Sequence, residues 1–219
     1  MKLTKYTHAC VRLEQDGSAL VIDPGSFSEV EEALRGASAV LITHEHPDHL
    51  DVERVAEGMA ADPGLQLWAP AAAAAALRAR LGAGAADGVH VSEPAIQFTA
   101  GGFDVRTFGG QHALIHPHVP MIANVGYLIN DNVYHPGDSF IVPDATEVRT
   151  LLVPVHAPWS KTAEVIDFIA SVRAAKAYPI HDSLLTDGGI GLVESLLARF
   201  GGSAGSRYEH LSPGQTTEV

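Results

Sequence analysis

The run THEHPDHLD at residues 43–51 concentrates side chains that can bind metal ions. Four of them fall within six residues: His44, His46, Asp48 and His49. Alternate residues of an extended segment point the same way, so His44 and His46 can bind one ion. Pro47 bends the chain after them, and Asp48 and His49 can then face a second ion. Because imidazole and carboxylate together suit zinc, iron or manganese, the run predicts a metal site.

Two ions need more ligands than this run supplies, and three later residues share a suitable local context. Each is of ligand type and follows the C-terminal end of a predicted strand, where α/β sheets place their sites. They are His112 after the strand at 103–108, Asp138 after 132–134, and His181 after 177–180. We expect these three side chains to complete the ligand set.

Five further histidines and one aspartate are candidates for the pocket wall or for support of the ligands: His8, Asp23, His116, His118, His135 and His156. One of His116 and His118 could replace His112 as a ligand. Otherwise the two line the pocket and meet an anionic substrate group, or they lie in solvent. His8 follows a short strand, and a place in the pocket wall is open to it.

His135 and His156 are expected to support the site rather than to catalyse. His135 lies three residues before Asp138, and ligating carboxylates are usually hydrogen-bonded themselves. His156 can approach the site with Trp159 packed beneath it. Asp182 is expected to cap the turn after His181.

The elements that must position these residues alternate between strands and helices. Strands are predicted at 2–6, 10–14, 19–22, 39–43, 65–69, 89–91, 96–98, 103–108, 124–129, 132–134, 150–153 and 177–180. Helices are predicted at 28–35 with Ser28 as N-cap, 52–60, 71–81, 162–174 and 192–200, and loops at 81–88 and 201–206. This order predicts a single α/β domain over 1–219, with two sheets face to face and helices outside.

The amino-acid composition excludes several classes of protein. With 46% hydrophobic and 18% charged residues, the chain of 219 residues can bury a core, which excludes a disordered or fibrous protein. A net charge of −12 opposes binding to a phosphate backbone, and the single cysteine, Cys10, excludes internal disulfides. Neither a secretory signal nor an apolar run that could span a bilayer is evident. We expect a cytoplasmic protein without nucleic-acid or membrane partners.

The order and spacing of the ligand-type residues closely resemble those of the metallo-β-lactamase-fold superfamily, from about residue 3 to the end. The resemblance rests on His44-x-His46-x-Asp48-His49, then His112, Asp138 and His181. It implies a four-layer αββα sandwich with a dinuclear metal centre. One metal would be held by His44, His46 and His112, and the other by Asp48, His49 and His181, with Asp138 bridging both.

Four further runs, THACVRLEQDG, LVIDPG, HPGDS and PVHAPW, resemble the branch that contains ascorbate-6-phosphate lactonase and related bacterial zinc-dependent hydrolases. In this superfamily the turn equivalent to Asp23 lies beneath the metal loop, so Asp23 is expected to support the ligands. After the motif the chain reads His49-Leu50-Asp51, whereas glyoxalase II and the true lactamases usually place a glycine two residues past that histidine. The chain is also much shorter than the ascorbate-6-phosphate lactonases, so the resemblance does not specify the substrate.

The ligand set predicts a metal-dependent hydrolase. A hydroxide that bridges two divalent metals would cleave an ester, lactone or phosphodiester bond in a small molecule, and Asp48 would orient that hydroxide and take its proton. Zinc is favoured, and manganese or iron also fits. Lys161 and Arg207 are cations of the kind that a phosphate substrate would need. The alternative is a non-catalytic or weakly catalytic metal-binding sensor or partner protein of the same fold. In either case a homo-oligomer is compatible with the sequence.

Overall fold

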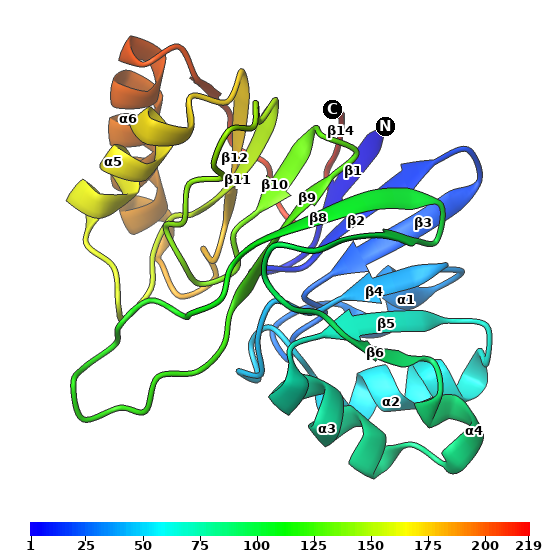
Figure 1. The fold of residues 1–219 in the computed structure, drawn as a ribbon. Coiled ribbons are helices and arrows are strands. Elements are labelled where there is room, and N and C mark those ends of the chain that lie inside the picture. Colours follow the sequence, from blue (N-terminus) through cyan, green and yellow to red (C-terminus); the bar gives the residue numbers. More distant parts are fainter.

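The computed structural model describes residues 1–219, apart from the side chain of Ala83. Two seven-stranded sheets pack face to face, and helices cover their outer faces (Figure 1). The first sheet contains, in spatial order, β14 (Thr216–Glu218), β1 (Lys2–Lys5), β2 (Val11–Gln15), β3 (Ser18–Ile22), β4 (Ala39–Leu41), β5 (Gln66–Ala69) and β6 (Val89–Val91). The second contains β13 (Arg207–Tyr208), β12 (Lys176–Ile180), β11 (Thr150–Pro154), β10 (Val133–His135), β9 (Val125–Ile129), β8 (Phe103–Gly109) and β7 (Gln97–Ala100).

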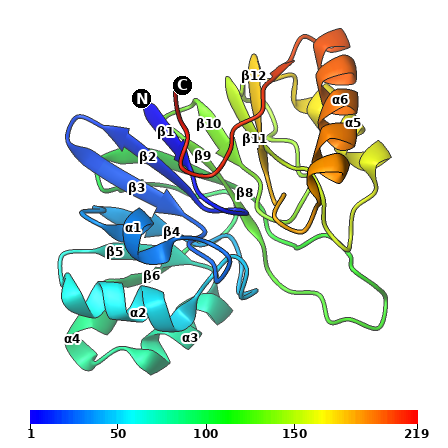
Figure 2. The same cartoon turned by 180° about the vertical axis from the view of Figure 1, so that it is seen from behind.

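The helices divide between the two outer faces. Those against the first sheet are α1 (Val30–Leu34), α2 (Val52–Ala61), α3 (Ala71–Arg80) and α4 (Ala83–Ala86). Those against the second are α5 (Thr162–Val172) and α6 (Asp187–Ser203), seen on the opposite side in both views (Figures 1 and 2). Among the residues described, no helix combines the length and the apolar character needed to cross a membrane.

Three clusters of apolar side chains lie between the four layers of the sandwich. Strand β3 contributes to two of them, because its side chains alternate between two buried faces. Leu20 and Ile22 pack between the two sheets, whereas Val21 packs against the helices of the first sheet. A third cluster joins the second sheet to α5 and α6 through side chains such as Phe168 and Leu197. The predicted αββα sandwich is confirmed.

Three sequence predictions about local structure were wrong. Ser28 does not cap α1, because its hydroxyl donates to the carbonyl of Gly25, and the helix begins at Val30. The segment predicted as a loop at 81–88 contains the short helix α4. Helix α6 starts at Asp187, where Thr186 caps it, and continues through the predicted loop as far as Ser203. At one of its glycines α6 packs closely on α5, because a Cβ at Gly201 would lie 2.8 Å from Ile169.

The parallel strands bring the segments of the metal motif to one edge of the sandwich. β3 pairs in parallel with β4, and β10, β11 and β12 pair in parallel in the other sheet. The C-terminal ends of these strands therefore point the same way within each sheet. The loops that follow β4, β8, β10 and β12 meet at that edge (Figure 1).

Candidate metal centre

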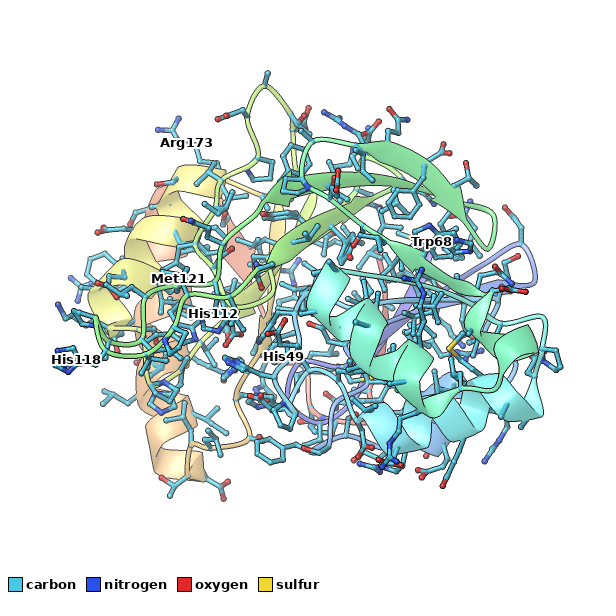
Figure 3. The ribbon with its side chains drawn as sticks, turned by 60° about the horizontal axis from the view of Figure 1, so that its bottom comes forward. His49, Trp68, His112, His118, Met121 and Arg173 are labelled. Carbon is cyan, nitrogen blue, oxygen red and sulfur yellow. The ribbon has the colours of Figure 1, made fainter. Side chains whose placement is uncertain are left out.

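The seven predicted ligands converge at the edge where these loops meet. They form two groups whose ligand atoms lie within 4.8 Å of one another, and the second group also contains His8: His44, His46, His112 and Asp138, then His8, Asp48, His49 and His181. Figure 3 shows His49 and His112 near one another in the middle of the molecule. The two groups thus match the two metal positions that the sequence resemblance implied.

The first group is built from three imidazoles around a common point. The ring centroids of His44 and His46 are 4.8 Å apart, and His112 lies 4.9 Å from His44 and 4.8 Å from His46. Each pair of rings is nearly perpendicular, at 73–82°. Three equidistant rings set edge to face can direct one nitrogen each at a single ion, which suits tetrahedral coordination.

The second group combines a carboxylate with imidazoles from two distant loops. Oδ2 of Asp48 lies 3.5 Å from Nε2 of His181 and 3.9 Å from Nε2 of His49. Asp48 remains partly accessible, with 23% of its side chain exposed, whereas only 5% of the side chain of Asp138 is. Of the two carboxylates at the centre, Asp48 is therefore the one that can contact water.

Asp138 lies between the two groups. Its Oδ2 is 3.3 Å from Nε2 of His112, and its Oδ1 is 3.0 Å from Nε2 of His49 and 3.3 Å from Nε2 of His181. One oxygen thus faces each group, as a bridging carboxylate requires. Gly137 makes this approach feasible, because its φ of +61° and its close contact with Thr43 leave no room for a Cβ.

Five buried polar atoms at this centre have no hydrogen-bond partner among the described residues: Nε2 of His44, His49, His112 and His181, and Oδ1 of Asp138. A buried polar atom without a partner typically destabilises a fold by about 1–3 kcal/mol. Five such atoms directed at one another form a donor set of imidazole nitrogen and carboxylate oxygen that divalent cations bind. The residues present fit two divalent ions.

The other nitrogen of each buried ring is hydrogen-bonded, which would leave Nε2 free to bind a metal. Nδ1 of His112 donates to the carbonyl of Ala113, and Nδ1 of His181 to that of His156, each at 2.6 Å. Nδ1 of His49 donates to Oδ2 of Asp23 at 2.7 Å. Each of the three rings is thereby held in the tautomer that a metal ligand needs.

Asp23 supports both groups at once. Its carboxylate is fully buried and accepts the backbone N–H of Thr43 at 2.7 Å, the hydroxyl of Thr43 at 2.6 Å and the ring of His49. Because the Thr43 hydroxyl donates to Asp23, it accepts from Nδ1 of His44 at 3.0 Å. The turn also lies directly against the metal loop, since a Cβ on Gly25 would overlap the backbone of Asp48.

His8 holds Asp48. Its ring is fully buried, its Nε2 donates to Oδ2 of Asp48 at 3.1 Å, and its Nδ1 accepts from the hydroxyl of Ser183 at 2.8 Å. His8, Asp23 and His181 all adopt positive φ, at 67°, 52° and 58°. Such conformations are uncommon for residues other than glycine, so the surrounding structure must enforce them at these three positions.

His135 and Asn124 fix the loop that carries Asp138. Nε2 of His135 donates to the carbonyl of Ala9 at 2.9 Å, and its Nδ1 accepts from the backbone of Gly137 at 3.1 Å. Oδ1 of Asn124 accepts the backbone N–H of Asp138 at 2.9 Å. The place of His135 in support of the site agrees with its position three residues before Asp138. The role of Asn124 was not predicted, because its only sequence signal is a polar residue at the start of an apolar strand.

Trp159 contacts the carboxylate of Asp138 rather than packing beneath His156. Its Nε1 donates to Oδ2 of Asp138 at 2.8 Å, and its ring packs on Phe140 with centroids 5.0 Å apart. His156 contributes its backbone carbonyl, which accepts from His181.

Replacing Trp159 with phenylalanine should lower kcat/KM, or the metal affinity, by about tenfold or more, the usual effect of removing a residue that supports a metal ligand. The packing on Phe140 is kept, so the unfolding temperature should change little. Trp68→Phe is the matched control, because Trp68 stacks on Phe98 away from the centre (Figure 3). Equal activity of the two variants would contradict the role of the Trp159 N–H.

Four other residues singled out in the sequence lie elsewhere. A cavity lies directly above the centre and is lined in part by His46, Asp48 and His181. His116 and His118 are exposed, contact each other and do not line this cavity; His118 lies at the outer edge of the molecule in Figure 3. Lys161 precedes α5 and the exposed Arg207 pairs with Glu209, and neither lines that cavity. Asp182 begins the predicted turn, since its backbone carbonyl accepts from the N–H of Leu185 at 3.0 Å, while its side chain pairs with the buried ammonium of Lys5 at 3.0 Å.

The electrostatic surroundings lower the pKa of some imidazoles at the centre and raise the pKa of others. Burial and neighbouring histidines hold the pKa of His44 well below its usual range. Burial also lowers the pKa of His49, but the carboxylates of Asp138 and Asp23 outweigh it and raise that pKa well above the usual value. Burial likewise opposes protonation of His181, yet Asp138 and Asp48 raise its pKa to about 9.

This division predicts that the unfolding temperature depends differently on pH with and without metal. The folded-state pKa of His181 lies above the ordinary 6.5, so its protonated form stabilises the metal-free fold. That contribution is complete below about pH 6.5 and is lost as the pH rises through about 9. The unfolding temperature of metal-free protein should therefore fall over this window. The gap between metal-loaded and metal-free protein should widen, because metal binds the unprotonated ligands.

Thermal unfolding at pH 6.5, 7.5 and 9, with chelator and with metal, measures both responses. His181→Gln should flatten the curve of the metal-free protein. A metal-free unfolding temperature that rises between pH 6.5 and 9 would contradict the assignment.

Comparisons with known proteins agree with this architecture. The family model described as a beta-lactamase superfamily domain matches residues 2–181. Protein Rv0786c of Mycobacterium tuberculosis is 39% identical over 192 residues, which cover 84% of this chain and 85% of that protein. A protein of Xanthobacter autotrophicus named UPF0173 metal-dependent hydrolase is 34% identical over 173 residues, covering 72% of this chain and 68% of that protein.

A solved structure shows the same fold at low identity. Igni18, a metallo hydrolase from the archaeon Ignicoccus hospitalis, superposes with a TM-score of 0.72 at 17% identity, over 100% of this chain and 98% of that chain. The narrower resemblance to the ascorbate-6-phosphate lactonase branch stays a prediction. From the match over most of its length and from its four-layer architecture, the chain belongs to the β-lactamase superfamily and has the metallo-β-lactamase fold.

Proposed function

We propose that the protein is a dinuclear metal-dependent hydrolase that cleaves an ester, lactone or phosphodiester bond in a small molecule. The observation that carries the proposal is the pair of ligand groups with Asp138 between them, in which five buried polar atoms of the described residues have no hydrogen-bond partner. Two divalent ions bound there would lower the pKa of a shared water toward neutrality and polarise the bond to be cleaved. Zinc suits the imidazole-rich set best, and manganese or iron also fits.

Side chains of the protein orient the attacking water and transfer its proton. Asp48 is accessible from the cavity and is held by His8, so it can orient the attacking water and accept its proton. The same proton can then pass to the leaving oxygen. Trp159 donates to the carboxylate of Asp138 and Asn124 accepts its backbone N–H, so the two residues keep that carboxylate in place throughout.

Hydrolysis assays on metal-loaded and chelated protein test the proposal. The substrates are p-nitrophenyl acetate, bis-p-nitrophenyl phosphate and a homoserine lactone, one for each bond type. Turnover of at least one of them should appear with metal, vanish on chelation and return when metal is restored. Asp48→Asn should lower the turnover by at least about a hundredfold. Metal-loaded protein that hydrolyses none of the three would favour the alternative of a metal-binding sensor, and activity that survives chelation would contradict the metal mechanism.

A further inference from the structure

A cavity of about 360 Å³ opens directly above the metal centre. Its floor is formed by the ligands His46, Asp48, His112, Asp138 and His181. The rest of its lining is almost wholly apolar: Phe27, Pro47, Ile115, Pro158, Trp159 and Leu184, with Ser26 the only other polar residue. The volume is near the lower end for small-molecule sites, so a small substrate fits it.

Three of the apolar side chains remain exposed although they lie on separate loops. Phe27 follows β3, Ile115 follows β8 and Leu184 follows β12, and 45%, 38% and 53% of these residues are exposed. Ile115 belongs to the long loop between β8 and β9, which extends beyond the body of the molecule in Figures 1 and 2. Single exposed apolar residues are common, but three from distant segments around one cavity mark a binding surface.

The cavity lining is also without a fixed positive charge. Of the residues that the structure describes, no lysine or arginine lines it, and the two cations considered for a phosphate substrate lie elsewhere. An anionic group that extended beyond the metals would lose its hydration against apolar walls and gain no ion pair. An uncharged group would instead remove apolar surface from water.

We infer that the substrate is an uncharged carboxylic ester or lactone whose acyl part is apolar and lies against Phe27, Ile115 and Leu184. This inference rests on the proposed hydrolase function. Of the three bond types proposed there, it selects the ester or lactone over the phosphodiester. Water forms a bond to the carbonyl carbon while the C–O bond breaks. The proton taken by Asp48 moves to the leaving oxygen, so the products are a carboxylic acid and an alcohol, or a hydroxy acid from a lactone.

The length of the acyl group of the substrate provides the test. The metal-loaded protein is assayed on p-nitrophenyl acetate, butyrate and hexanoate, and on bis-p-nitrophenyl phosphate as the anionic comparison. Each buried methylene is worth up to about fourfold in binding, so kcat/KM should rise at least tenfold from acetate to hexanoate. The phosphodiester should be the poorest of the four substrates.

Variants of an apolar residue of the cavity lining show whether the preference for long acyl groups arises there. Leu184→Ala should reduce the hexanoate-to-acetate ratio of kcat/KM at least threefold, and Leu184→Lys should reduce it further while improving the phosphodiester relative to hexanoate. Leu192 offers the matched control, since it is 65% exposed on α6 and does not line the cavity. Leu192→Ala and Leu192→Lys should leave the ratios as in the unaltered protein.

Two failures can be told apart. Equal kcat/KM for the three esters, or a phosphodiester that exceeds hexanoate, overturns the inference about the substrate and leaves the hydrolase standing. A metal-loaded protein that hydrolyses none of the four overturns the proposed function, and the inference with it.

Discussion

Replacing Asp138 with alanine should lower kcat/KM of the metal-loaded protein by at least about a thousandfold. Removing a residue that only supports a metal ligand typically costs 10–100-fold, and Asp138 itself faces both metal groups, with one oxygen toward His112 and the other toward His49 and His181. Its loss removes a ligand from both positions and leaves the indole of Trp159 without an acceptor. The measurement is steady-state hydrolysis together with metal content per chain.

Two controls separate this effect from unfolding. Asp144 is an exposed aspartate six residues further along the chain, and Asp144→Ala should keep full activity and metal content. Asp138→Asn keeps the size of the side chain but not its charge, and it should lose metal as the alanine variant does. If Asp138→Ala retains two metal ions and more than a tenth of the activity, Asp138 does not bridge the ions.

Removing the metals should lower the unfolding temperature by about 10 °C or more. A ligand that binds only the folded state at a free concentration a thousand times its dissociation constant stabilises that state by about 4 kcal/mol. For a chain of this size, each kcal/mol shifts the unfolding temperature by about 2–4 °C. The metal-free centre also keeps five buried polar atoms without partners, which weakens the fold that remains.

Scanning calorimetry before and after chelation measures this shift, and re-addition of zinc or manganese should reverse it. Asp138→Ala provides the internal comparison, because a protein that has lost its bridging ligand should respond much less to chelation. An unfolding temperature that is unchanged once the metal is verified to be gone would contradict a metal site built from these residues.

That the seven candidate ligands come together could be predicted because the signals for them are local. His44, His46, Asp48 and His49 share one short run, and the remaining ligands each follow an apolar strand whose end must reach the same edge of a sheet. The pattern of buried strands was likewise sufficient for the four-layer architecture, since strands buried on both faces need a layer on each side.

The supporting contacts could not be predicted, because they join residues far apart in the chain. The hydrogen bond from Ser183 to His8 spans 175 positions, and neither residue type indicates its partner. The indole of Trp159 reaches Asp138 only because the loop after β11 folds over the site. For the same reason the apolar wall was missed, since Phe27, Ile115 and Leu184 come from three separate loops.

Anomalous diffraction from crystals of zinc-loaded protein tests the dinuclear centre most directly. Two peaks should appear about 3.5–4 Å apart, one beside His44, His46 and His112 and the other beside Asp48, His49 and His181. The carboxylate of Asp138 should lie between them. A single peak, or peaks away from these side chains, would contradict a centre in which two metals act together.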